Sequence, residues 1–484
     1  MLPRTRVPAR NRGDYRSAMN FGELRFWELL CAGLVVIIGL RWICAVVAPS
    51  RLTIFDKCGL LALGLFLLLC VSWVTFIIFL IVAFTTYAGL AWLLRRPRAW
   101  AFRCLPILIV FQLLPLFVFK YADFVVNGVF NAQVGLFHGL LIPVGISFYT
   151  FQKVAFVVDV LVLRQPLPRF LDYMNFTAFF PQIVAGPIER KVNLLPQMEN
   201  FRFRWLPTEI SEGAGWIALG LFFKCALADN LAQQFDGAFS TNPFLLWRDN
   251  ILFGLRIYFD FAGYSLVAIG VARCLGVRLT LNFRSPYCAR NIREFWHRWH
   301  ISLSTWFRDY VYIPLGGGRT KLWALNIAFV FVVSGVWHGA GWNFVLWGAL
   351  HGALLIVCRL AEKINLPGIL AWAVTMAGVF FAWLGFYETR TGVLLRKAAV
   401  LLTPSGYTPA ALRAAAHELA SPNGVVLGGF LALAALTLLA EWVSIRRRGE
   451  EYVFLRHPIG LVIIVALTVI LAPGRNNAFI YFAF

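Results

Sequence analysis

The sequence predicts an all-α polytopic membrane protein with about 10–12 transmembrane helices. Its 484 residues are 60% hydrophobic and only 14% charged, whereas soluble domains have roughly 45–50% apolar and about 25% charged residues. Two runs of 37 residues, between Lys57 and Arg95 and between Lys321 and Arg359, contain no charged residue. As a single helix, such a run would extend about 55 Å, well beyond the roughly 30 Å hydrocarbon core. Each run must therefore break, fold back or extend past the bilayer.

The apolar segments of the chain are candidate membrane spans. All of them belong to one membrane-embedded domain that covers residues 1–484. The candidate spans are residues 27–48, 58–94 (one long helix or two short ones), 105–125, 138–163, 213–232, 250–275, 322–358 (two helices), 367–387, 423–443 and 457–472. Residues 164–212 contain six prolines, which disrupt regular helix, so we expect an interfacial or re-entrant connector there. Residues 390–422 are expected to form a loop with one short amphipathic helix.

Basic residues outnumber acidic ones by 44 to 23, which gives a net charge of +21. In a soluble protein this excess would indicate nucleic-acid binding, but Lys and Arg also collect in the cytoplasmic loops of membrane proteins. We therefore expect no nucleic-acid partner and a cytoplasmic basic N-terminal segment, residues 1–25. The arginines of 95–103 and 446–448 are expected on the same side of the membrane.

Residues 275–321 form a connector that is both basic and aromatic. It contains eight basic residues against only Glu294 and Asp309, together with several Trp, Tyr and Phe residues. Aromatic residues of this kind concentrate at the membrane–water interface. We expect this segment to lie at the cytoplasmic membrane face, either as an ordinary anchor or as a surface that receives a phosphorylated or acidic partner.

Metal binding is the first hypothesis that the sequence disfavours. The nine cysteines include no CxxC pair, so they indicate neither a disulfide framework nor a zinc site. His297 and His300 form an HxxH pair on one helical face. One such pair with isolated His338 and His351 falls short of the several histidine boxes of a membrane di-iron enzyme. We therefore expect no metal and no permanently bound cofactor.

His338 lies in the apolar, Trp-rich stretch VSGVWHGAGWNFVLWG, residues 333–348. A buried histidine can be purely structural, but ionisable residues in membrane segments tend to mark functional sites. An imidazole kept neutral by desolvation could also act as a general base. Gly339 would let a substrate chain approach the backbone, and Trp337 and Trp342 would wall an apolar channel.

A transporter or channel without catalysis is the rival class. Such a protein should place charged residues at mid-span, as a relay for ions or protons. The charged residues that we single out at or near the candidate spans show no matched acidic relay: Arg41, Lys224, Arg256 and Asp260. These residues alone leave both classes open.

Several stretches together resemble the membrane-bound O-acyltransferase family, and most of all its bacterial alginate O-acetyltransferase branch. They are IPVGISFYTFQ (142–152), FFPQIVAGPIERKVNLLPQ (179–197), FDFAGYSLVAIGVARCLG (259–276), NFRSPYCARNIREFWHRWHISLSTWFRDYVYIPLGGGR (282–319), SGVWHGAGWNFVLWGALHG (334–352) and FIYFAF (479–484). The resemblance implies tilted helices around a central tunnel, with a catalytic core in residues 142–352.

The family's near-invariant histidine falls on His338, in the WHG motif, and its second motif residue falls on His300, in RWHISLS. The resemblance implies that His338 is the catalytic base and that His300 orients the thioester or donates to the oxyanion; their roles remain interchangeable at this stage. His297 stands where the family more often has Arg or Asn, and we interpret it as a polar interfacial substitution.

The same motifs supply candidates for substrate contact. The tunnel candidates are Trp299, Ser302, Ser304, Trp337, Gly339 and Asn343. The basic candidates for binding the donor on the cytoplasmic side are Arg293, Arg298 and Arg308.

The resemblance also implies a reaction and its partners. A multi-pass protein of the bacterial inner membrane, embedded in membrane lipid, would take an acetyl group from acetyl-CoA or an acyl carrier protein. The acetyl group would reach an exported polysaccharide such as alginate or cellulose through a periplasmic SGNH-type acetyltransferase and the polysaccharide synthesis machinery. D-alanyl transfer to teichoic acid from a carrier protein is the alternative. YIPLGGG (312–318) favours the acetyl branch.

Overall fold

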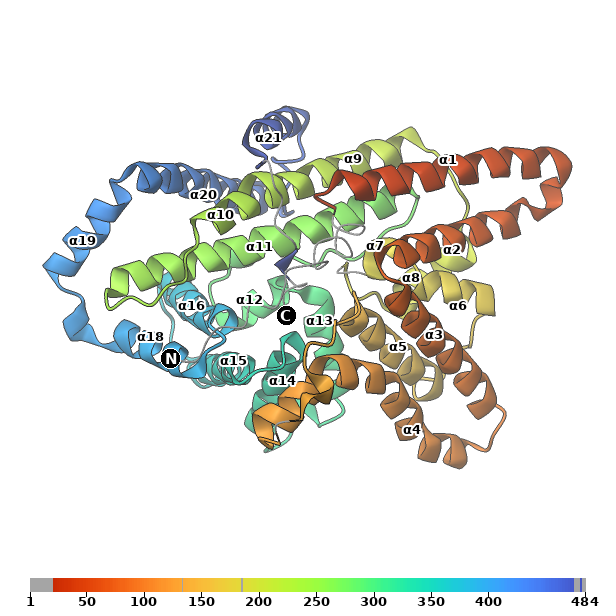
Figure 1. Cartoon of the computed structure of the whole chain (residues 1–484), viewed down its shortest axis with the longest axis horizontal. Coiled ribbons are helices and arrows are strands. Elements are labelled where there is room, and N and C mark those ends of the chain that lie inside the picture. The colour runs from red at the N-terminus through yellow and green to blue at the C-terminus, as the bar shows by residue number, and fades with distance from the viewer. Residues whose placement is uncertain (1–20, 133, 184–185, 474–478, 481–484) are drawn as a thin grey trace.

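The computed structural model describes residues 21–132, 134–183, 186–473 and 479–480, and all regular elements in this part of the chain are helical (Figure 1). The α-helices are α1 (Leu24–Val47), α2 (Leu52–Val71), α3 (Trp73–Leu93), α4 (Arg98–Leu116), α5 (Ile146–Leu161), α6 (Phe170–Thr177), α7 (Phe180–Ile183), α8 (Lys191–Glu199), α9 (Pro207–Leu221), α10 (Asp229–Gln234), α11 (Pro243–Cys274), α12 (Ile292–Arg298), α13 (Ile301–Phe307), α14 (Trp323–His338), α15 (Trp342–Leu360), α16 (Gly368–Ala382), α17 (Leu384–Tyr387), α18 (Thr391–Leu402), α19 (Pro409–Leu419), α20 (Pro422–Arg448) and α21 (Pro458–Leu471). Short π-helices occur at Phe117–Tyr121, Phe124–Val129, Phe222–Ala228 and Arg308–Tyr312.

Nine helices in the described residues are long and apolar enough to cross a membrane, and α14 and α21 are shorter apolar helices. This confirms the all-α polytopic fold. The charge-free run 58–94 divides at Ser72, whose hydroxyl accepts from the Thr75 N–H and caps α3. The run 322–358 divides into α14 and α15, as predicted. Residues 1–20 of the predicted basic segment 1–25 lie outside the described residues.

The predicted span 138–163 and the predicted loop 390–422 both differ from expectation. The predicted span 138–163 is helical only from Ile146, and 14 of the 16 residues of α5 are buried, so α5 lies inside the bundle. Residues 390–422 form two helices, α18 and α19, where one was expected. Composition sets the length of an apolar segment, but it does not show whether lipid or protein surrounds that segment.

Three of the four charged residues singled out in the candidate spans form ion pairs. Lys224 lies 2.9 Å from Asp229 and 2.7 Å from Asp260, and all three side chains are buried. Arg41 pairs with Asp56 at 2.7 Å. Asp56 and Asp229 were not predicted from the sequence as partners of these residues. Paired charges of this kind tie helices together.

Helix α11 is the most enclosed long helix, and it packs against α9 at backbone distance. A Cβ added at Gly270 would lie 2.6 Å from the Gly213 carbonyl oxygen, and one added at Gly263 would lie 2.7 Å from the Gly220 carbonyl oxygen. Glycine therefore permits this contact, as small residues do between membrane helices. The pair crosses the middle of the molecule and supports the short helices around it.

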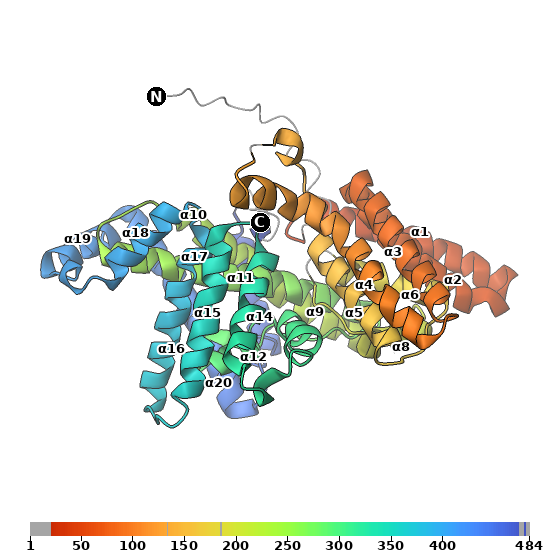
Figure 2. The same ribbon diagram turned by 90° about the horizontal axis from the view of Figure 1, so that it is seen from below.

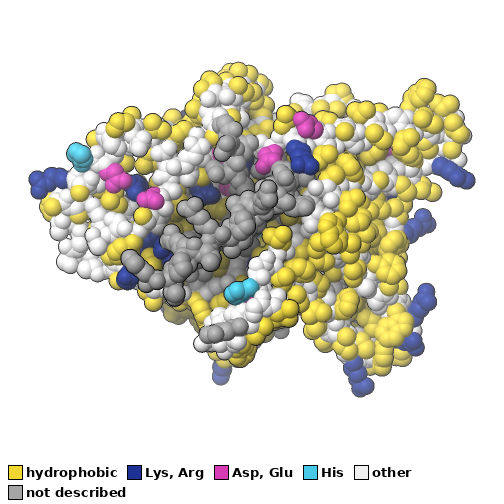
Figure 3. Space-filling view, viewed as in Figure 1, with side chains coloured by type: hydrophobic (Ala, Val, Ile, Leu, Met, Phe, Trp, Pro, Cys, Tyr) yellow, Lys and Arg dark blue, Asp and Glu magenta, His cyan; other side chains and the backbone are white. Residues whose placement is uncertain are grey.

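The hydrophobic outer surface and the arginines at helix ends indicate how the molecule is oriented in a membrane. Hydrophobic side chains cover much of the surface over α1–α4, with Lys and Arg at its edge (Figure 3). In Figure 2 the loop between α15 and α16 and the lower part of α20 reach the same edge of the molecule. Arg359 and the triplet 446–448 lie at the ends of α15 and α20. The positive-inside rule predicts that this edge is cytoplasmic.

Replacing Gly270 by Ala is expected to destabilise the protein, because the new methyl group meets backbone that cannot move alone. Overpacking of this kind costs about 1–3 kcal/mol. The melting temperature in detergent should therefore fall. Gly428→Ala is the matched control: it also lies within a helix, and a Cβ there meets nothing within 4 Å. An equal melting temperature for both variants would contradict the close-packing interpretation.

Candidate active site

Helix α14 ends on His338, and aromatic rings enclose this side chain. The helix is followed by Gly339 in extended conformation (φ −162°), which leads into α15. The ring centroids of Trp337, Trp347 and Phe386 lie 4.9, 5.0 and 5.3 Å from the imidazole. His338 is only 2% exposed. The side chain therefore faces the protein interior.

His300 lies between α12 and α13 in the left-handed backbone region, with φ +43° and ψ +54°. Few non-glycine residues adopt this conformation, and such strain concentrates at functional sites. The Asn282 Oδ1 accepts from the Ser302 N–H at 3.1 Å and from the Ser302 hydroxyl at 2.9 Å. His300 Nδ1 lies 3.3 Å from the same oxygen. Because that oxygen accepts from the Ser302 N–H, this contact favours the tautomer that carries the proton on Nδ1 and leaves Nε2 of the neutral ring as the proton-accepting nitrogen.

The structure brings His300 and His338 together. Their ring centroids are 6.4 Å apart, and the Trp337 ring contacts both of them at 5.9 and 4.9 Å. His351 lies further along α15, with its ring 4.7 Å from that of Trp347. His300 and His338 therefore form one buried pair, and His351 lies next to the Trp347 indole.

A cavity of about 690 Å³ is lined by residues that neighbour both histidines in the sequence. Ile301 follows His300, and Ser334 lies one turn before His338. The lining residues do not include His300 or His338 themselves. The polar and charged residues of its lining are Arg293, His297, Ser304, Thr305, Arg308, Ser334, Arg359 and Glu362.

The predicted donor-binding residues separate into two groups. Arg293 and Arg308 line the cavity, as does the predicted tunnel residue Ser304. A hydrogen bond to Asp309 raises the pKa of Arg308, which keeps its guanidinium charged. Arg298 does not line the cavity: it pairs with Glu294 at 2.9 Å.

The other predicted tunnel residues have packing or positioning contacts. Ser302 is bonded to Asn282. Trp299 is 1% exposed and stacks on Phe295, with ring centroids 5.5 Å apart. The Asn343 amide donates to the Gly385 carbonyl at 3.0 Å, which fixes α15 to α17.

Gly339 also has a packing role. A Cβ at this position would lie 2.0 Å from the Phe344 ring. The space on this side of the glycine is therefore filled by a side chain of α15, and the approach of a substrate to the backbone of Gly339 stays a prediction. Glycine is required at this point because the two helices meet closely.

The aromatic residues of 275–321 also differ from expectation. Trp296, Trp299 and Trp306 are 7%, 1% and 6% exposed. They pack in the core, so the middle of this segment does not lie on the membrane surface. Several of its basic side chains are exposed, among them Arg290, Arg293 and Arg308, since long Arg side chains can leave their charged ends in water.

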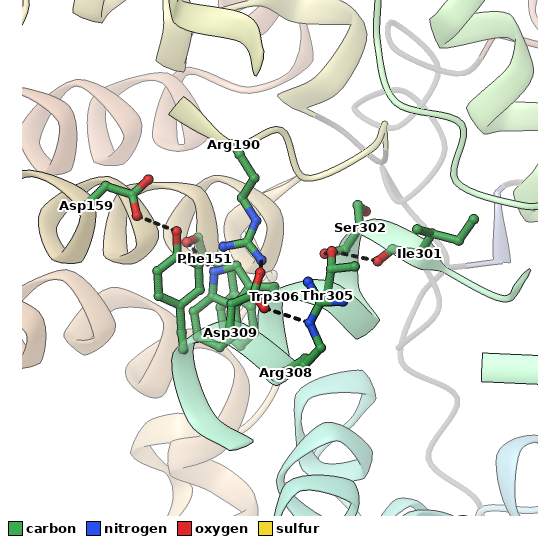
Figure 4. Close-up of polar contacts among 10 residues, drawn as sticks. Phe151, Asp159, Arg190, Ile301, Ser302, Thr305, Trp306, Arg308 and Asp309 are labelled. Atoms are coloured by element: carbon green, nitrogen blue, oxygen red, sulfur yellow. Dashed lines mark hydrogen bonds and ion pairs between the residues drawn. The ribbon is translucent and has the colours of Figure 1, made fainter. Parts of the chain in front are cut away.

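A polar network fastens the cavity wall to α5 (Figure 4). The Trp306 indole donates to the Phe151 carbonyl at 2.9 Å, and the Tyr310 hydroxyl bonds to Asp159 at 2.6 Å. Arg190 pairs with Asp309 at 3.0 Å. These contacts fix α13 and the π-helix Arg308–Tyr312 against elements that are distant in sequence.

Sequence inspection missed Lys120, which supports the backbone at His338. Its ammonium donates to the carbonyl oxygens of Trp337 at 2.7 Å and His338 at 3.0 Å. The Tyr121 hydroxyl donates to the Trp337 oxygen at 3.3 Å. A helix end leaves carbonyls without intrahelical partners, and a cation is favourable there. An isolated lysine within the apolar run 105–125 was the available signal.

Lys120→Met is expected to lower the melting temperature, because the His338 carbonyl loses its donor and the Trp337 carbonyl keeps only the Tyr121 hydroxyl. Each unsatisfied group costs about 1–3 kcal/mol. Lys120→Arg, which keeps the charge and the N–H groups, should recover most of the loss. Thermal unfolding of both variants in detergent tests this, and equal losses would show that the hydrogen bonds contribute little.

Comparison with known proteins identifies several relatives of this chain. Relatives include a peptidoglycan O-acetyltransferase of Helicobacter pylori, 37% identical over 309 residues, which are 55% of this chain and 58% of that protein. A protein of Azotobacter vinelandii named "Probable alginate O-acetylase AlgI" is 36% identical over 323 residues, 63% of this chain and 64% of that protein. A teichoic acid D-alanyltransferase of Bacillus subtilis is 31% identical over 282 residues, 52% of this chain and 69% of that protein.

The chain thus spans between 58% and 64% of the length of the first two relatives. A family model matches a longer part of the chain than any single motif covers. Residues 71–394, more than half of the chain, match MBOAT, the membrane-bound O-acyltransferase family. The chain therefore belongs to the membrane-bound O-acyltransferase family.

Proposed function

We propose that this chain moves an acetyl group from a cytoplasmic thioester donor across the bacterial inner membrane for O-acetylation of an exported polysaccharide. One observation supports this most directly. Two buried histidines with ring centroids 6.4 Å apart lie close in sequence to Ile301 and Ser334, which line a cavity whose lining also includes basic residues. Acyl transfer needs an acid–base group at an enclosed point that a donor can reach.

The cavity suits a thioester with a charged distal end. Arg293, Arg308 and Arg359 are among its lining residues, whereas Val330 and Phe331 give it apolar walls. The phosphates of acetyl-CoA or the acidic surface of an acyl carrier protein would contact the arginines, and the acyl arm would extend inward. The donor is then a substrate, and no permanently bound cofactor or metal is needed for the chemistry.

His338 would act as the general base. It takes the proton from an acceptor hydroxyl, and the oxygen attacks the thioester carbonyl. The tetrahedral oxyanion collapses, the carbon–sulfur bond breaks, and the thiolate takes the proton back from the imidazolium. His300 would orient the thioester or, in its protonated form, donate to the oxyanion. Asn282, which holds Nδ1 of His300, sets the direction of that ring.

The acceptor is the exported polymer itself, alginate- or cellulose-like, or a periplasmic SGNH-type acetyltransferase that passes the acetyl group on. Relatives at 36–37% identity are named for O-acetylation of alginate and peptidoglycan. Relatives named teichoic acid D-alanyltransferase are 29–31% identical. This difference favours acetyl transfer, and D-alanyl transfer from a carrier protein remains the alternative. A transporter or channel is the alternative of another class.

His338→Ala is expected to abolish acyl transfer while membrane insertion stays normal, since a general base typically contributes 10²–10⁴-fold. Acetyl transfer from radiolabelled acetyl-CoA to polysaccharide, measured in membranes with matched protein levels, tests this. His417→Ala is a control, because His417 lies in α19, outside the site. Near wild-type transfer by His338→Ala would refute the assignment.

His300→Ala separates a chemical role from a structural one. If His300 acts on the thioester, transfer slows by roughly 10²-fold or more, the scale of one lost oxyanion donor, and the melting temperature stays close to wild type. A destabilised variant with full activity per folded molecule would instead make His300 structural. Both quantities are to be measured on one preparation.

The direction of transfer depends on the cytoplasmic location of the cavity mouth. Single-cysteine variants at Arg293 and Arg447, built in a cysteine-free background, should be labelled by a membrane-impermeant maleimide only after the cytoplasmic face is opened. Labelling of the cysteine at position 293 from the periplasm of intact cells would invert the proposed direction of transfer.

A further inference from the structure

We propose that a groove between α15 and α16 binds an anionic phospholipid, a site distinct from the donor cavity. The groove has a volume of about 600 Å³. Its apolar lining includes Leu354, Val357 and Val374, and Val357 and Val374 are 60% and 57% exposed. Both helices belong to the candidate membrane spans, so this exposed apolar surface faces acyl chains.

Three polar residues of the groove lie at one end of it. Arg290, Asn291 and Asn365 lie there, next to the start of α16. In Figure 2 the loop that joins α15 to α16 reaches the edge that the positive-inside rule places in the cytoplasm. The groove therefore has a charged end at the headgroup level and an apolar length toward the bilayer interior. That distribution matches the chemistry of a phospholipid.

Arg290 supplies the charge that selects an anionic headgroup. Its neighbours Arg293 and Arg298 pair with Glu362 at 2.8 Å and with Glu294 at 2.9 Å. Arg290 has no ion pair with a carboxylate in the part of the chain that the structure describes. Its guanidinium lies over Gly368, where an added Cβ would be 3.7 Å from both Cζ and Nη1. A phosphodiester would complete this contact, and basic side chains near the membrane attract anionic lipid.

The site also shares a wall with the proposed donor cavity. Arg293 and Glu362, which form one ion pair, line both spaces. A bound lipid headgroup would therefore lie on one side of this pair and the donor on the other. The binding proposal itself goes beyond the proposed function and is tested without turnover, so failure of either one is visible separately.

The test uses the full chain in nanodiscs made from an equimolar mixture of phosphatidylcholine and phosphatidylglycerol. Lipid that stays bound after extraction into detergent is identified by mass spectrometry. Wild-type protein is expected to retain phosphatidylglycerol roughly five-fold over phosphatidylcholine, the ratio for about 1 kcal/mol from one basic side chain. Arg290→Ala should reduce this ratio to near one, whereas Arg447→Ala, an exposed arginine outside the groove, should leave it unchanged.

A second variant tests the groove. A Cβ at Gly378 would make ordinary contacts with the Leu354 methyl groups, at 3.5 and 3.6 Å, so Gly378→Leu fits the helix and fills the groove. It should reduce retention of both lipids. Equal retention of the two lipids by wild type, an equal effect of Arg447→Ala, displacement of the lipid by inorganic phosphate alone, or unchanged retention in Gly378→Leu would each overturn the proposal.

Discussion

The arrangement of this protein depends on an apolar helix, α14, that is shorter than the hydrocarbon core of a membrane. α14 has 16 residues, about 24 Å at 1.5 Å per residue, against a hydrocarbon core of roughly 30 Å. A helix end in this layer leaves backbone carbonyls without water, so it must be enclosed by protein. Lys120 and Tyr121 meet that requirement from a distant segment. The same enclosure gives His338 a dry, shaped environment.

The surrounding structure enforces that enclosure through close packing. Glycines let α9 meet α11 and α14 meet α15 at backbone distance; a Cβ at Gly335 would lie 2.1 Å from the Phe344 oxygen. Aromatic rings fill what remains between the elements, from Phe261 against His300 to Phe386 against His338. The buried pair is held by the scaffold on every described side, which limits the rearrangement that a reacting site would otherwise require.

Much of the fold followed from the sequence because apolar length and charge-free runs are direct consequences of the bilayer. The division of 322–358 into two helices was predicted, and a division of 58–94 was one of two alternatives, but the break positions at Ser72 and Gly339 were not predicted. The meeting of His300 with His338 was predicted only through resemblance. The aromatic segment 275–321 was misplaced, because Trp is equally suited to an interface and to a packed core. Lys120 was missed because its partners, the carbonyls of Trp337 and His338, lie more than 200 residues away.

The left-handed backbone of His300 has a consequence for comparing sequences. Backbone energetics alone favour glycine or asparagine at such a position, since other side chains are strained there. A histidine that persists at position 300 across relatives would therefore oppose the local conformational preference and would mark a chemical demand. Persistence of glycine at positions 335 or 339 would mark only the contact with α15. Two residues of the sequence motifs can thus be equally constant for unrelated physical reasons.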